Sequence, residues 1–119
     1  MTYFHPPVIV LTKLIFKMDK IHELIKQIKK RPAMYLSSNY ISCLKAFLDG
    51  WYIRDPDNVS DAHMMAEFQD WIEKRYKTKT SNSWSRIILF HSQDESDALD
   101  KFFDDYEEFY FEYEKTNKK

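Results

Sequence analysis

The sequence predicts an all-α fold, a compact bundle of four or five helices in one domain. Apolar residues recur at helical spacing along several segments of the 119-residue chain. Gly50 is the only glycine, whereas tight hairpins and phosphate-binding loops depend on glycines. Aromatic residues make up 17% of the chain, and their large buried area can complete a core at this size. Multi-hairpin β folds and nucleotide-loop enzymes are therefore not expected.

The first two helices are predicted from their apolar spacing. Residues 19–31 carry an apolar face, and Pro32 ends this helix. A second helix is expected from Tyr40 to Ile53, with capping residues among Ser37, Ser38 and Asn39. Its apolar residues cover more than half of its circumference, which predicts that it is the central, most buried helix.

The second half of the chain predicts two further helices and one ambiguous segment. A third helix is expected over residues 61–76, with Ser60 as its cap, followed by a polar loop over 77–83. Residues 84–91 fit either a short strand or one helical face. Asp94 and Ser96 are candidate caps for a last helix that reaches about Glu114.

Residues 1–17 are interpreted as an N-terminal arm, a short strand or an upstream extension, and residues 18–119 as a single helical domain. The regular pattern begins at Met18, which makes this residue a plausible start. The apolar run near the N-terminus is about half as long as a membrane-spanning helix, so no membrane partner is expected. Cys43 is the only cysteine, so no intramolecular disulfide can form. This composition fits the reducing cytoplasm.

The last predicted helix carries the strongest charge signal. Residues 94–114 contain ten acidic residues and a single base, Lys101, which gives a net charge of −9, while the remaining residues carry +8. On a helical wheel one arc is apolar and predicts the core face. Its members are Leu99, Phe102, Phe103, Tyr106, Phe109, Tyr110 and Tyr113. Phe111 lies away from this arc, among acidic residues.

An aromatic residue surrounded by exposed charge is typical of an interface anchor. The acidic face around Phe111 would complement a basic protein surface and would repel DNA and RNA, so nucleic acid is not an expected partner. The alternative interpretation is a solvated helix face, since acidic residues early in a helix also suit its macrodipole.

The histidines raise two alternatives, a metal site and a catalytic site. His63 and Glu67 stand four residues apart on the third helix, but no second histidine completes a metal site, so no metal or cofactor is expected. A ribonuclease could use His22, His63 and His91 for general acid–base catalysis, if the fold brought them together. That alternative remains open beside a non-catalytic regulatory or scaffold protein.

Five segments together are similar to a class of small bacterial proteins. They are RPAMYL at 31–36, ISCLKAFLDGW at 41–51, FQDWIEKRY at 68–76, SWSRIILF at 83–90 and DALDKFF at 97–103. Their order resembles immunity proteins of polymorphic and contact-dependent toxin systems, over roughly residues 18–112. Those paired with EndoU-like RNase toxins are the nearest group. Ser37 departs from the pattern, because such proteins often carry glycine after MYL.

The resemblance implies a non-enzymatic inhibitor that binds its cognate toxin domain tightly and blocks the active site, and we expect a one-to-one complex in the cytoplasm. Contacts vary between such pairs, so no residue roles are transferred from the class. The expected toxin-binding residues come instead from the acidic face: Asp100, Asp104, Glu107, Glu108 and Phe111.

Overall fold

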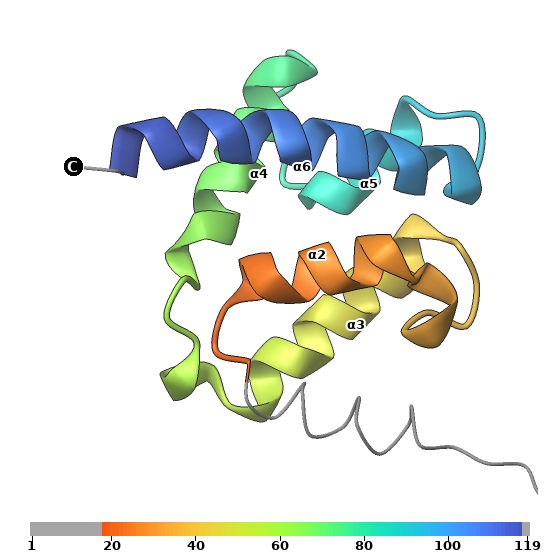
Figure 1. Cartoon of the computed structure of the whole chain (residues 1–119). Coiled ribbons are helices and arrows are strands. Elements are labelled where there is room, and N and C mark those ends of the chain that lie inside the picture. Colours follow the sequence, from red (N-terminus) through yellow and green to blue (C-terminus); the bar gives the residue numbers. More distant parts are fainter. Residues whose placement is uncertain (1–17, 118–119) are drawn as a thin grey trace, which may run out of the picture.

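The computed structural model describes residues 18–117, and this part of the chain is built from helices and loops without a strand (Figure 1). Its five α-helices are α2 (Ile21–Lys30), α3 (Ile41–Arg54), α4 (His63–Arg75), α5 (Trp84–Phe90) and α6 (Glu95–Asn117). Short 3-10 turns, Pro32–Met34 and Pro56–Asn58, follow α2 and α3. The predicted all-α bundle is confirmed. The arm, strand or extension predicted over 1–17 lies outside the described residues.

Helix α6 is the longest helix and organises the bundle. In Figure 1 it runs along one side of the molecule, with the α2–α3 pair beside it and α4 and α5 farther back. It packs directly against α3, α4 and α5. It also contacts α2, where His22 stacks on Tyr110 with ring centroids 3.5 Å apart.

The core is rich in aromatic rings that meet edge to face. Phe68 of α4 is fully buried and its ring centroid lies 5.6 Å from that of Phe102 and 5.2 Å from that of Phe109, both on α6. Trp84 of α5 closes the same cluster, 5.5 Å from Phe68. Such edge-to-face pairs add to the free energy that burial of the rings contributes.

Helix α3 is less buried than the sequence predicts. Its apolar residues Tyr52 and Ile53 are exposed, Ile53 by 72%. The helix buries Ile41, Leu44, Leu48 and Trp51. Helix α6 buries the larger set, namely Ala98, Leu99, Phe102, Phe103, Asp105, Tyr106 and Phe109. Helix α6 packs against α3, α4 and α5, so more of its surface faces other helices.

The ambiguous segment 84–91 is helical over Trp84–Phe90. Trp84, Ile87 and Ile88 are buried together, at the spacing of one helical face. Cys43 is half-buried on α3.

The caps predicted for α3 and α4 are wrong. Helix α3 follows Tyr40 and α4 follows Ala62, and neither start has a side-chain cap from its own flanking residues. Ser60 instead bonds the carbonyl of Asp19 through its N–H, at 2.8 Å. For α6 the prediction of Asp94 is confirmed, because its Oδ1 accepts the N–H of Asp97 at 2.8 Å. The prediction of Ser96 is wrong, because this residue lies inside α6.

Helix starts are capped by side chains from distant elements. Asp61 accepts the N–H groups of Ile21 and His22 at the start of α2, at 2.7 and 3.1 Å. Glu95 of α6 accepts the N–H of Ser42 in α3 at 3.0 Å. Gln69 of α4 accepts the N–H of Trp84 at the start of α5 at 2.6 Å. These bonds satisfy amide groups that a helix start leaves unpaired, and they fix the elements relative to one another.

Candidate protein-binding surface

The predicted site residues lie together on the outer face of α6. We call Asp100, Asp104, Glu107, Glu108 and Phe111 the acidic stripe; all five side chains are exposed. The stripe follows from helical geometry, because each member lies three or four residues from another member. The opposite face of the same turns is buried, with Phe102 and Tyr106 in the core. Core burial of one face therefore presents the other to solvent.

Cations from neighbouring helices pair with the flanks of the stripe. Lys29 of α2 forms an ion pair with Glu107. Arg75 of α4 donates from Nη1 to Oε2 of Glu108 at 2.7 Å. This hydrogen bond is the main cause of the raised pKa of Arg75. The stripe is thus bordered by a positive charge on each side, which the sequence did not reveal because Lys29 and Arg75 are far from α6 along the chain.

The centre of the stripe keeps its charges free. Asp100 and Asp104 are exposed and have no hydrogen bond or ion pair with any residue from 18 to 117. Phe111 is 61% exposed, and the Nζ of Lys115 lies 4.2 Å from its ring centroid. Two unpaired carboxylates and an accessible aromatic ring therefore share one helix face.

Asp105 belongs to α6 but not to this surface. Its side chain is buried, and its Oδ2 accepts a hydrogen bond of 2.6 Å from the hydroxyl of Tyr76. Its Oδ1 lies 3.8 Å from Nη2 of Arg75. Burial raises the pKa of the Asp105 carboxyl, against the opposing effects of Tyr76 and Arg75. This carboxylate ties the end of α4 to α6.

The three histidines considered for catalysis each have their own partner. Nδ1 of His22 lies 2.7 Å from the hydroxyl of Tyr106, and Nε2 of His63 lies 3.0 Å from that of Tyr113. Nδ1 of His91 donates to the carbonyl of Ile87 at 2.9 Å. Within the described residues no two of these rings contact each other, so this arrangement does not favour the ribonuclease alternative.

No group of three or more histidine, cysteine or carboxylate side chains in the described part of the chain could hold a metal ion. None of its helices has the length and apolarity that crossing a bilayer requires.

A pocket at the junction of α4 and α5 was not predicted. Its volume is about 640 Å³, and it is lined by the loop that follows α4 and by α5. The sequence showed residues 77–83 only as a polar segment without periodicity, which gives no sign of a cavity.

No protein-family model, curated protein or solved structure matches the chain. The resemblance to immunity proteins therefore stays a prediction from the sequence.

Proposed function

We propose that this protein is an immunity-type inhibitor that binds a basic toxin domain through the acidic stripe of α6. The toxin is a bacterial nuclease, bound one-to-one in the cytoplasm and blocked at its active site. One observation carries the proposal: Asp100 and Asp104 are exposed, unpaired within the described residues, and on the same helix face as the accessible ring of Phe111.

Charge and aromatic area would have different roles in such a complex. Unpaired carboxylates attract a basic partner over several ångströms and raise the rate of encounter. A partly exposed phenylalanine gains most when it enters a pocket on the partner, and anchors of this kind slow dissociation. Lys115 lies over the ring of Phe111, so it would have to move aside as the partner approaches.

A nuclease suits this surface because its active-site cleft must attract phosphate. Lys and Arg side chains supply that attraction, and they would meet the carboxylates of the stripe. An inhibitor seated there both neutralises the cleft and excludes the substrate. The ion pairs at Glu107 and Glu108 hold these two carboxylates in place beside the free ones.

The test is co-expression and pull-down with the C-terminal domain of the protein encoded immediately upstream, together with rescue of growth. A one-to-one complex that restores growth is the expected result. A complex without rescue would favour the regulatory or scaffold alternative. The absence of both binding and rescue would refute the toxin partner.

Matched variants then test the stripe itself. The double variant Asp100→Asn/Asp104→Asn should weaken binding by about tenfold or more, and Phe111→Ala by a similar factor. The controls are Glu23→Gln/Asp57→Asn, which changes the same charge on exposed residues outside α6, and Ile53→Ala, which shortens another exposed apolar side chain. Equal losses in the stripe and control variants would show that binding uses another surface.

A further inference from the structure

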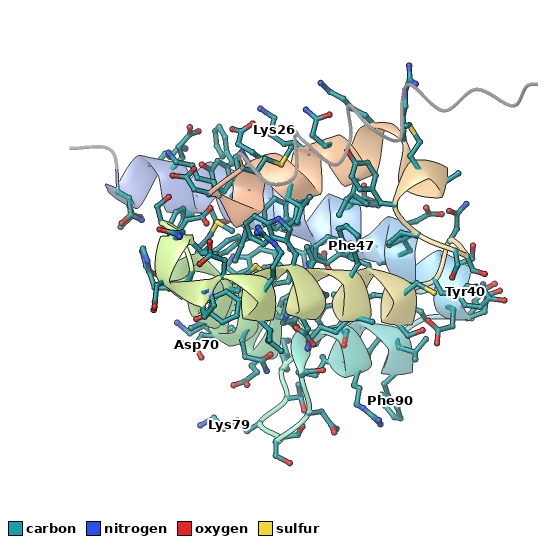
Figure 2. The ribbon with its side chains drawn as sticks, turned by 90° about the horizontal axis from the view of Figure 1, so that it is seen from below. Lys26, Tyr40, Phe47, Asp70, Lys79 and Phe90 are labelled. Atoms are coloured by element: carbon teal, nitrogen blue, oxygen red, sulfur yellow. The ribbon has the colours of Figure 1, made fainter. Side chains whose placement is uncertain are left out.

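The pocket at the α4–α5 junction has a composition unlike that of the acidic stripe. Its walls include Lys77, Thr80, Asn82, Arg86, Phe90 and His91. Figure 2 shows Lys79 and Phe90 projecting from the same edge of the molecule, on the side opposite Lys26. A volume of about 640 Å³ lies within the range of small-molecule sites.

The lining is cationic. It contains Lys77 and Arg86 and no carboxylate. Neither side chain has a hydrogen bond or ion pair with another described residue. Lys77 also borders an adjoining hollow that includes Lys74 and Lys79, together with the carboxylates of Asp70 and Glu73. Cations without partners at the edge of a concave surface attract an anionic group.

Phe90 supplies the apolar part of the pocket. It is 83% exposed, the highest value among the large hydrophobic residues of the described chain. Its ring is nearly perpendicular to that of His91, at a centroid distance of 5.2 Å, and the ring centroid of His91 in turn lies 4.9 Å from that of Tyr76. An exposed ring backed by further rings offers a platform on which a planar ligand can stack.

Lys77 occupies a backbone position that favours glycine. Its φ is 53°, and it has the only positive φ of a non-glycine residue in the described chain. The N–H of Thr78 bonds the carbonyl of Glu73 at 3.0 Å, and that of Lys77 bonds Lys74 at 3.2 Å. These two bonds form the motif that ends a helix with a left-handed residue, where glycine avoids the steric cost of a side chain. A lysine at this position makes the fold less stable than glycine would, but it places a cation at the pocket.

We propose that this pocket binds a nucleotide unit, with its phosphate at Lys77 and Arg86 and its base stacked on Phe90. Cations beside an exposed aromatic ring are the combination that binds phosphate and base together. An acidic peptide would use the cations but would leave the ring of Phe90 without a partner. The site is independent of the acidic stripe, and the unit can come from a free mononucleotide or from single-stranded RNA.

Binding to the full chain is measured by calorimetry with AMP, UMP and inorganic phosphate, and by fluorescence anisotropy with a labelled oligouridine octamer. The mononucleotides should bind about tenfold more tightly than phosphate, because stacking adds to the charge interaction. An octamer that binds no more tightly than UMP identifies the free nucleotide as the source. An octamer that binds at least about tenfold more tightly identifies the strand.

Four variants locate the site. Phe90→Ala and Arg86→Gln should each weaken nucleotide binding by about tenfold, whereas Lys26→Gln, on the opposite edge, should leave it unchanged. Lys77→Gly should weaken binding and yet raise the melting temperature by roughly 3 °C, since glycine relieves the left-handed strain. Weaker binding together with a higher melting temperature would show that Lys77 binds the ligand and does not merely stabilise the fold.

Three results would overturn the proposal. The first is the absence of nucleotide binding at millimolar concentration. The second is equal weakening by Lys26→Gln, which would mean general electrostatic attraction. The third is a polyglutamate peptide that binds as tightly as the nucleotides, which would identify a site for acidic peptides.

Discussion

Asp105 lies among exposed acidic residues of α6, but its carboxylate is buried against Tyr76 and Arg75. Helical periodicity assigned seven residues to the core face and did not include this one. The cause is a partner that no local pattern contains, because Tyr76 is 29 residues away. Without the hydroxyl of Tyr76, burial of this carboxylate would leave it unsatisfied.

Asp105→Asn is expected to stabilise the protein at neutral pH. Burial raises the pKa of Asp105 in the folded state, so the stability that its protonated form contributes is present below about pH 4 and is lost as the pH rises through the folded pKa. Asparagine imitates the neutral acid and keeps an oxygen for Tyr76. Urea unfolding should show a gain at neutral pH that shrinks toward about pH 4. A loss that is the same at every pH would mean that the Tyr76–carboxylate bond outweighs the cost of burying charge.

His22 has the opposite pH dependence. Burial is the main cause of its lowered pKa, opposed by Glu23 and Asp61 and reinforced by Lys26. The neutral ring stabilises the fold above the unfolded pKa of about 6.5, and this contribution is lost as the pH falls through the lower, folded pKa.

The variant His22→Phe keeps a ring that can stack on Tyr110 but cannot be protonated. It should cost about 1 kcal/mol at pH 7.5 through the lost hydrogen bond to Tyr106. Its unfolding free energy should fall less than that of the wild type between about pH 7 and pH 5. Parallel pH profiles of the two proteins would exclude His22 as the titrating group.

At the scale of elements, long periodic helices were predictable and helix starts were not. The apolar arc of α6 extends over several turns, so its helix and its core face follow from the sequence alone. Caps were assigned from the nearest polar residues, yet Asp61 caps α2 and Glu95 caps α3. Both bonds depend on tertiary packing, so local capping rules could not identify them.

Asp61→Ala is expected to destabilise the protein by about 1–2 kcal/mol, because two N–H groups of α2 lose their acceptor. Urea unfolding measures the loss. Ser60→Ala is the matched control, since the hydroxyl of Ser60 makes only a longer bond of 3.3 Å to Asp19. Equal losses of unfolding free energy in the two variants would show that the cap of α2 contributes no more than the hydroxyl bond of Ser60 to the carbonyl of Asp19.

At the scale of the whole molecule, the charge separation counted from the sequence is partly neutralised by the fold. Residues 94–114 carry −9, but Lys29 and Arg75, which lie outside this segment, each pair with one of its carboxylates. Sequence reasoning located the acidic stripe and its aromatic residue, because both follow from helical spacing. It missed the flanking cations and the α4–α5 pocket, because these depend on contacts between distant segments.

The salt dependence of the association rate should show which carboxylates act in partner binding. Raising the ionic strength from low to physiological should weaken the complex, mainly through slower association. Asp100→Asn/Asp104→Asn should make this dependence clearly shallower, while Glu107→Gln should change it less, because Lys29 already pairs with Glu107. Stopped-flow association rates over a salt series measure both effects. An identical slope in all three proteins would mean that these charges do not steer the encounter.

The most direct measurement is the affinity of the C-terminal toxin domain encoded upstream for the wild type and for Asp100→Asn/Asp104→Asn/Phe111→Ala. Calorimetry should give one-to-one binding by the wild type and a loss of at least about a hundredfold in the variant. A circular dichroism spectrum checks that the variant keeps its helices. A variant that folds normally and binds as tightly as the wild type would contradict docking through α6.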